Sequence, residues 1–244
     1  MKQGFFEIVE NTQLTRDVYR MKLVGDVSDI TAPGQFVNVK LDGLFLRRPI
    51  SVCDCDEKSC TILYKVVGDG TERMSQMKEG RLDVLTGLGN GYDTSLSGET
   101  PLLLGGGVGV PPLYLLAKKL ISEGKSVTVI LGFNTESEIF YEEEFRALGA
   151  RVIVTTVDGS AGVQGFVTDA MRDLSYTYFY TCGPEPMLRS VFKTSVTSGQ
   201  FSFEERMGCG FGACMGCSCK TVTGYKRICK EGPVLQKEEI LWEK

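Results

Sequence analysis

The chain has 244 residues with 27 basic and 31 acidic side chains, so its net charge is -4 and no basic stretch indicates nucleic acid as a partner. It contains no histidine, which excludes a Ser-His-Asp triad, a histidine-ligated zinc site, a Rieske cluster and a histidine general base. The N-terminus meets a charge before an apolar segment can build, and prolines and glycines interrupt the uncharged stretch 101–117, so we expect no signal peptide, no membrane span and a cytoplasmic protein.

Short apolar and partly alternating runs, separated by turn residues, fill the first hundred residues. Examples are 36–40, 50–53 and 61–67. Regularly spaced short strands of this kind predict a small antiparallel barrel. One helix is expected at 71–77, with Thr71 as its N-cap. We therefore predict a β-barrel domain at residues 1–98.

A pattern suited to gripping a flavin nucleotide lies within this first domain. Arg48-Pro49-Ile50-Ser51 sets a guanidinium and a hydroxyl three residues apart around a rigid proline, which suits a diphosphate and the edge of an isoalloxazine ring. Gly70 and Thr71 open the predicted helix, whose N-terminal amides offer an anion site. Alone, an Arg-Pro-x-Ser run is more often a strand end, so the order of these pieces carries the interpretation. Three residues between them are expected to wall the flavin: Leu63, Tyr64 and Lys65.

After residue 98 the apolar runs alternate with helical stretches. The strand-like runs are 102–104, 127–131, 152–155 and 177–180. The helical stretches are 113–122, 142–148, 167–174 and 185–195. This alternation predicts a parallel sheet with crossover helices, and we place an α/β domain at residues 99–200.

Two loops of this α/β domain are candidates for a dinucleotide site. One is a glycine-rich strand-to-helix turn, where glycine permits close backbone approach to a pyrophosphate, although a tight turn without a ligand is the competing interpretation. The other follows the last strand at the same carboxyl edge, where ligands of open parallel sheets bind. Segment 132–138 holds acidic and no basic residues, which favours NAD over NADP. The candidate residues are Gly105, Gly107, Gly109, Val110, Pro111, Cys182, Gly183, Pro184 and Glu185.

Four cysteines near the end carry the strongest chemical pattern. Their spacing is C-x4-C-x2-C-x11-C, which indicates a plant-type 2Fe-2S site, and they are Cys209, Cys214, Cys217 and Cys229. Zinc is the main competitor, but structural zinc sites usually pair their ligands as two short hooks. Nine cysteines without a sign of secretion do not indicate disulfides. Cys219 is an alternative to Cys217, although the known spacing fits Cys217. Residues 201–244 are expected to form a small cluster-binding module.

Taken in order, the flavin motif, the glycine-rich turn, the Cys-Gly-Pro loop and the terminal cysteines resemble the ferredoxin-reductase superfamily. More closely, and over essentially its full length, the chain is similar to the electron-transfer subunits of type B dihydroorotate dehydrogenase. Segments 205–217 and 225–234 are the most specific part of this resemblance. Segment 86–89 departs from it, because Thr86-Gly87-Leu88-Gly89 stands where members of that family often have Gly-Pro-Leu-Gly, and the spacer before Cys229 is shorter than in some members.

The resemblance implies three cofactors: FAD on the first-domain motif, a 2Fe-2S cluster on the four cysteines, and NAD. It also implies a partner, an FMN-containing catalytic subunit that oxidises dihydroorotate in pyrimidine biosynthesis, in a heterotetramer with two of each subunit. Proton abstraction would occur on the partner, so no catalytic side chain is expected here, which fits the missing histidine. The alternatives are a related subunit of a ferredoxin:NADP reductase or sulfhydrogenase complex, and a zinc-stapled binding module.

Overall fold

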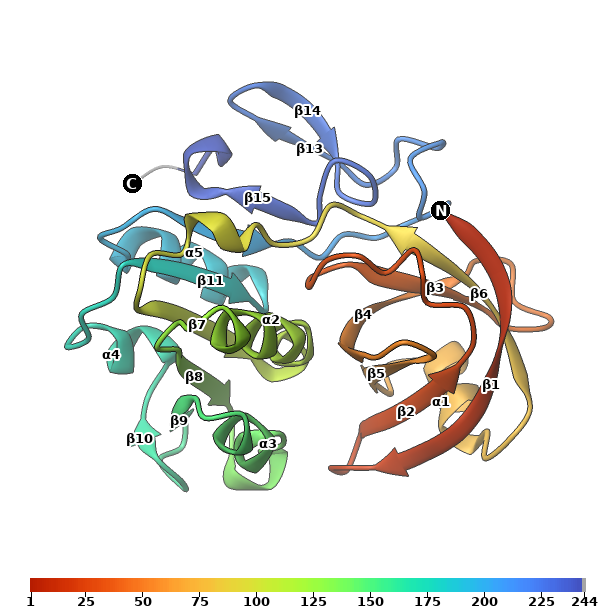
Figure 1. Ribbon diagram of the computed structural model, residues 1–244, viewed down its shortest axis with the longest axis horizontal. Coiled ribbons are helices and arrows are strands. Elements are labelled where there is room, and N and C mark those ends of the chain that lie inside the picture. The colour runs from red at the N-terminus through yellow and green to blue at the C-terminus, as the bar shows by residue number, and fades with distance from the viewer. Residues whose placement is uncertain (243–244) are drawn as a thin grey trace.

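The chain folds into an antiparallel barrel, an α/β layer and a small C-terminal module, in that order along the sequence (Figure 1). This computed structural model describes residues 1–242. The expected fold class, a barrel followed by a parallel sheet and a short cysteine-rich module, is confirmed. Within residues 1–242, no helix has the length and apolar character needed to cross a membrane.

Within the described residues, six strands close the barrel, and each neighbouring pair is antiparallel. In spatial order they are β1 (Lys2–Gln13), β2 (Val18–Val24), β5 (Ser59–Lys65), β4 (Arg48–Cys55), β3 (Phe36–Lys40) and β6 (Arg81–Leu88). Alternate side chains of a strand point to opposite faces, so Val37, Val39 and Ile62 are fully buried in the barrel core. Closure leaves no strand edge free to pair with another chain.

The helix of the barrel, α1 (Asp69–Gln76), begins two residues before its expected start. Its N-cap is Gly68, so the expectation that Thr71 caps it is wrong. Thr71 lies in the first turn instead, where its Oγ1 donates to the Gly68 carbonyl (3.0 Å) and accepts from the Val67 N–H (2.9 Å). This side chain therefore fixes the loop that leads into the helix.

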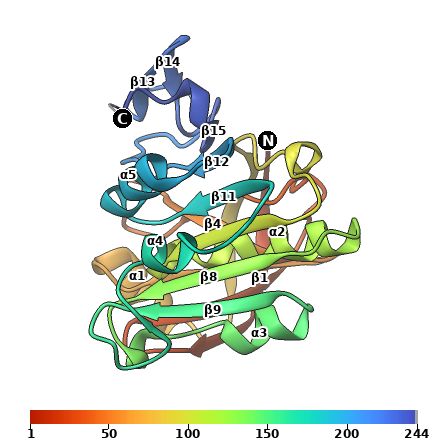
Figure 2. The same cartoon turned by 90° about the vertical axis from the view of Figure 1, so that its left-hand side faces the viewer.

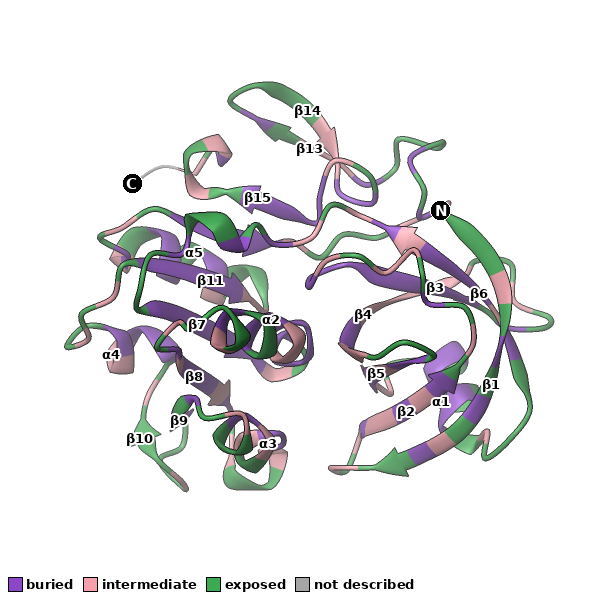
Figure 3. Cartoon of the chain, viewed as in Figure 1, coloured by how far each residue is buried: buried purple, intermediate pink, exposed green. Residues whose placement is uncertain are grey.

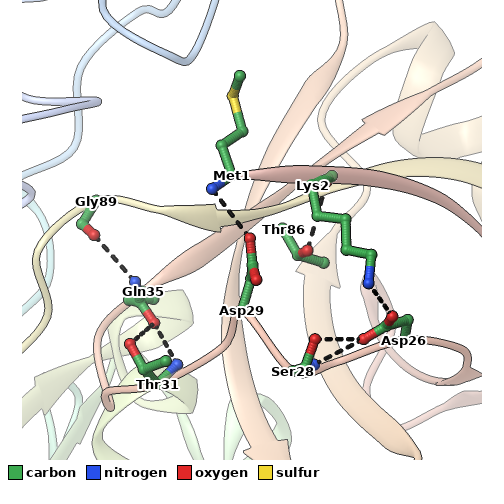
Figure 4. Close-up of polar contacts among 9 residues, drawn as sticks. All are labelled: Met1, Lys2, Asp26, Ser28, Asp29, Thr31, Gln35, Thr86 and Gly89. Carbon is green, nitrogen blue, oxygen red and sulfur yellow. Dashed lines mark hydrogen bonds and ion pairs between the residues drawn. The ribbon is translucent and has the colours of Figure 1, made fainter.

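The loop between β2 and β3 ties the start of the chain to the barrel (Figure 4). The amino group of Met1 pairs with Asp29 at 3.0 Å. Gln35 Oε1 accepts from the Thr31 N–H (2.7 Å), and its Nε2 donates to the Gly89 carbonyl (3.0 Å). Because Gly89 follows β6, this buried amide joins the start of β3 to the end of β6.

Within the described residues, the α/β part of the chain is built on a seven-stranded sheet. Its strand order is β10-β9-β8-β7-β11-β12-β15. The strands are β7 (Pro101–Gly106), β8 (Thr128–Phe133), β9 (Arg151–Thr156), β10 (Val163–Gln164), β11 (Tyr178–Cys182), β12 (Gly199–Ser202) and β15 (Val234–Gln236). All neighbouring pairs are parallel except β12 with β15. The central strands β7 and β11 are almost wholly buried (Figure 3), as expected for a sheet covered on both faces.

Helices cover both faces of this sheet (Figure 2). One face carries α2 (Pro111–Ser122) and α3 (Glu142–Ala147), and the other carries α4 (Val167–Met171) and α5 (Glu185–Thr194). Short 3₁₀ turns lie in the connections: η1 (Thr94–Leu96), η2 (Gly107–Gly109), η3 (Glu136–Glu138) and η4 (Lys237–Glu239). Helix α2 also packs against β4 of the barrel, where Lys118 Nζ pairs with Asp54 Oδ1 at 2.9 Å. The barrel and the α/β part therefore meet along β4, the strand that carries the flavin motif.

The C-terminal module consists of a cysteine loop and a hairpin, β13 (Ser218–Thr221) with β14 (Gly224–Arg227). Its return strand β15 leaves the module and pairs with β12 at the edge of the large sheet. Asn90, in the connection after β6, donates to the carbonyls of Glu231 (3.2 Å) and Val234 (2.7 Å). The module is thus attached to both the barrel side and the α/β layer.

Candidate functional site

The flavin motif lies over the start of α1. A Cβ placed on Gly70 would be 2.1 Å from Arg48 Nε, so the guanidinium rests directly on the first turn of the helix. Among the described residues, no side chain caps this helix end, and its first N–H groups remain available to an anion. A cationic fork above uncapped helical amides fits a diphosphate. Arg48 and the Gly70–Thr71 turn are therefore brought together.

The neighbouring Arg47 bonds to the barrel strands and does not face the helix. Arg47 Nη2 pairs with Asp83 Oδ1 at 2.9 Å, and its Nη1 donates to the carbonyls of Asn38 (3.2 Å) and Asp83 (3.1 Å). Both charged side chains are largely buried, with 18% and 14% of their surface exposed. Arg47 therefore braces β3 against β6, and Arg48 is left to face the helix.

The three residues expected to wall a flavin alternate in direction. Tyr64 points into the barrel core, where its hydroxyl donates to Asn11 Oδ1 at 2.9 Å. Asn11 Nδ2 in turn donates to the carbonyls of Met74 (2.7 Å) and Met77 (2.8 Å) at the end of α1. Burial raises the pKa of Tyr64 to about 12, so the hydroxyl keeps its proton. The Tyr64 side chain therefore lies inside the barrel and positions the helix through Asn11, a residue that no sequence pattern singled out.

The other two members of that trio point out of the barrel. Leu63 is buried in the core shared with the α/β layer, and Lys65 pairs with Asp17 at 3.0 Å. Only the backbone of this segment and the Lys65 side chain remain available to a ligand. The physical reason is the two-residue period of a strand, which sends neighbours to opposite faces.

The two expected nucleotide loops pack backbone against backbone. A Cβ on Gly109 would be 2.2 Å from the Cys182 carbonyl oxygen and 2.6 Å from Gly183 Cα. Gly107 has φ +52°, a left-handed conformation that glycine adopts readily. Glycine at these positions therefore lets the ends of β7 and β11 meet, as a dinucleotide site at the carboxyl edge requires.

Several side chains in these two loops are buried. Val110 and Pro111 are buried, so their side chains serve packing and offer no ligand surface. Burial also raises the pKa of Cys182 to about 12, with a weaker opposing hydrogen bond from Ser202. The Cys182 thiol therefore keeps its proton.

One cavity of about 730 Å³ is lined by residues from all three parts of the chain. Pro49 comes from the flavin motif, and segment 183–185 comes from the second nucleotide loop. The C-terminal module contributes Lys220 and Trp242, which the sequence patterns did not indicate, because nothing in a lone lysine or tryptophan marks it as a cavity wall. Tertiary packing therefore joins the flavin motif, the nucleotide loop and the module at one place.

The four spaced cysteines lie in two pairs. Cys209 and Cys214 exchange contacts, since each N–H lies near the partner's Sγ at 3.5 and 3.4 Å, and the Cys229 N–H donates to Cys217 Sγ at 3.4 Å. The Ala213 N–H also donates to Cys209 Sγ at 3.2 Å. Such N–H groups directed at sulfur stabilise thiolate ligands. The first pair is more exposed, whereas Cys217 and Cys229 are buried.

This arrangement suits a two-iron cluster, in which each iron takes two thiolates. Within residues 1–242, no three acidic or cysteine side chains are gathered around a single metal position, so the two separate cysteine pairs carry the interpretation. Partial burial raises the pKa of Cys209, but the N–H groups of Phe211, Cys214 and Ala213 together outweigh it and hold the pKa at about 6. The loop therefore favours thiolate at its exposed edge, and the residues fit a 2Fe-2S group.

Cys219 lies on the hairpin, opposite Lys226. Burial raises the pKa of its thiol, and the residue lines the large cavity. The N–H-to-sulfur contacts described above involve the other four cysteines. The geometry therefore favours Cys217 over Cys219 as the third ligand.

Comparisons with known proteins agree with these features. A family model described as the iron-sulfur cluster binding domain of dihydroorotate dehydrogenase B matches residues 204–241, and one described as an oxidoreductase NAD-binding domain matches residues 103–193. The chain is 44% identical over 250 residues to the electron transfer subunit of dihydroorotate dehydrogenase B (NAD(+)) from Fusobacterium nucleatum, covering 96% of each chain. It is 43% identical over 256 residues to the subunit of the same name from a Geobacillus strain, covering 99% of each.

Solved structures show the same architecture. A chain of an NADH-dependent reduced ferredoxin-NADP oxidoreductase is similar with a TM-score of 0.88 and 32% identity, covering 98% of this chain and 90% of that one. A ferredoxin NADP+ reductase from Neisseria gonorrhoeae with bound FAD and NADP shares the fold, with a TM-score of 0.70 and 16% identity over 80% of this chain and 90% of that one. With near-complete coverage by its relatives and the cysteine pairs in place, the chain belongs to the family of electron transfer subunits of NAD-linked dihydroorotate dehydrogenase B.

Proposed function

We propose that this chain passes electrons from a dihydroorotate dehydrogenase catalytic subunit to NAD, as a cytoplasmic oxidoreductase subunit of pyrimidine biosynthesis. The partner in this proposal holds FMN, and two copies of each subunit form a heterotetramer. The names of the full-length relatives support the partner and the acceptor. The observation that carries the proposal is the cavity where the flavin motif, the nucleotide loop and the cysteine module meet.

Each group is held by a different part of the chain in this scheme. FAD is held by the Arg48–Ser51 motif, the strand backbone at 63–65 and the Gly70–Thr71 turn. NAD is held by the turn at 105–111 and the loop at 182–185. The cluster is held by Cys209, Cys214, Cys217 and Cys229, and the domain limits are 1–98, 99–200 and 201–244. When bound, these groups supply single-electron uptake and hydride transfer to a nicotinamide.

The chain's own residues bind and orient in this scheme. The Arg48 guanidinium and the first amides of α1 neutralise phosphate charge. The neutral Cys182 thiol, next to the cavity-lining Gly183, exchanges no proton, since burial holds its pKa at about 12. No side chain of this subunit is assigned an acid or base role, because dihydroorotate is deprotonated on the partner.

The catalytic subunit is proposed to dock over the exposed Cys209 and Cys214 edge of the module. Phe211 and Met215 flank these cysteines with 42% and 53% of their surface exposed, and Phe45 is fully exposed. Phe45 lies two residues before Arg47, whose contact with β3 brings this loop near the cysteine loop. Exposed apolar side chains beside the cysteines, such as Phe211 and Met215, are typical of a partner interface.

The test is reconstitution of the chain, loaded with flavin and iron, with the catalytic subunit. Dihydroorotate should then reduce NAD, and Cys214→Ser should abolish this reaction while the catalytic subunit still reduces an artificial dye. A fully loaded complex that reduces the dye but not NAD contradicts the proposal. Activity only with reduced ferredoxin as donor would favour the ferredoxin:NADP reductase type instead.

A further inference from the structure

An unusual buried amide lies on the outer face of the barrel. Asn38 is only 1% exposed, and it stands in β3 between Val37 and Val39, whose side chains fill the barrel core. Strand alternation therefore sends the Asn38 side chain outward, toward the C-terminal module. An apolar residue is the usual occupant of so buried a position.

The oxygen of this amide accepts no hydrogen bond from the described residues. Asn38 Oδ1 is buried and has no hydrogen-bond partner among residues 1–242. A buried acceptor without a donor is destabilising. The hydrogen bonding of this side chain therefore comes from its other end, Nδ2.

That other end contacts the cysteine loop. Asn38 Nδ2 donates to the carbonyl of Cys209 at 3.2 Å, a contact between residues 171 positions apart. The next residue of the loop, Gly210, has φ +77°, and a Cβ there would be 2.2 Å from Asn38 Nδ2. Glycine at position 210 favours this left-handed turn and leaves room for the Asn38 amide. A larger residue there would push the amide away from the Cys209 carbonyl.

The amide is also fixed to the flavin side of the molecule. Asn38 pairs with Pro49 of the flavin motif across the β3–β4 ladder. Its carbonyl accepts from Arg47 Nη1 at 3.2 Å, and Arg47 is held by its ion pair with Asp83. A single side chain therefore connects the first ligand of the cysteine loop to the strand that carries the flavin motif.

We propose that Asn38 is a positioning residue for electron transfer, which sets the place of the Cys209 edge relative to the flavin strand. The inference rests on the proposed assignment of Cys209 as a cluster ligand. Electron transfer between two fixed centres falls steeply with their separation, so a loop released from this contact transfers more slowly. The amide does not touch a sulfur atom, and its effect passes through the Cys209 carbonyl.

The test uses the full chain with FAD and cluster, in complex with its catalytic subunit. Asn38→Leu removes the donor with little change of volume. Gln35→Leu is the matched control, because it removes a neighbouring buried amide that bonds the Gly89 carbonyl rather than the cysteine loop. The readouts are the electron paramagnetic resonance spectrum of the reduced cluster, iron content, and the rate of electron exchange between cluster and flavin in stopped flow.

We expect Asn38→Leu to broaden or shift the cluster spectrum and to slow the exchange, because losing one buried donor shifts the equilibrium toward the released loop about tenfold. Gln35→Leu should change thermal stability and leave the spectrum and the rate as in the wild type. Gly210→Ala, which pushes the amide away, is the second variant if Asn38→Leu fails to fold, and it should show the same spectral change.

If Asn38→Leu shows the wild-type spectrum and rate, or if Gln35→Leu changes them equally, the positioning role of Asn38 is wrong and the proposed function is unaffected. A wild-type chain that binds no 2Fe-2S cluster overturns the proposed function, and this inference with it. These failures are therefore distinguishable.

Discussion

Replacing Gly109 with alanine should separate the two nucleotide loops. The new Cβ would be 2.2 Å from the Cys182 carbonyl oxygen, about 1.2 Å inside the 3.4 Å at which ordinary van der Waals contact begins. The atoms that it meets belong to backbone at the end of a buried strand, so a rotamer change cannot relieve the clash. Gly109 has an ordinary φ, and the effect is therefore steric alone.

Overpacking of this kind costs roughly 1–3 kcal/mol. We expect Gly109→Ala to lower the free energy of unfolding by that amount and to weaken NADH binding, since the displaced turn is the proposed pyrophosphate site. Urea unfolding of the holoprotein measures the first effect, and an NADH titration measures the second.

Gly4→Ala is the matched control. Gly4 also has an ordinary φ, and its new Cβ would meet only Phe6 at 3.6 Å. This variant should unfold and bind NADH as the wild type does. If Gly109→Ala behaves like Gly4→Ala in both assays, the close approach of the two loops is not a feature of the protein.

Arg48→Met should weaken FAD binding by roughly 10- to 100-fold, because a charged hydrogen bond contributes about 1.5–3 kcal/mol, whereas Arg47→Met should lower stability and leave FAD affinity unchanged; flavin fluorescence and urea unfolding separate these effects. Cys217→Ser should remove iron and the visible absorption of the cluster, and Cys219→Ser should retain both; the opposite result reverses the ligand assignment. The Ser59 hydroxyl and backbone N–H groups of the same turn lower the pKa of Asp56 from 3.8 to about 2, so its stabilising effect is present above pH 3.8 and lost as pH falls toward 2. Asp56→Asn should reduce the change in urea midpoint over that interval, and an unchanged midpoint curve would contradict this.

Local sequence patterns determined the order of fold types and the chemistry of the last segment. Strand and helix periods depend on neighbours in the chain, so runs such as 36–40 and 152–155 predicted their strands well. The ligand spacing from Cys209 to Cys217 is equally local, because a short loop must wrap the cluster.

Contacts between distant segments decided the rest. The sequence does not say that Tyr64 points inward to Asn11, or that Arg47 braces the barrel while Arg48 faces α1. Nor does it place Asn38 beside Cys209, since 171 residues separate them and a lone buried asparagine carries no pattern. The amino-acid sequence by itself therefore determined which chemistry the chain carries, through short-range periods and spacings. Tertiary structure decided which side chains fix the flavin motif, the nucleotide loops and the cysteine loop relative to one another. Those contacts exist only after the barrel closes and β15 returns to the sheet.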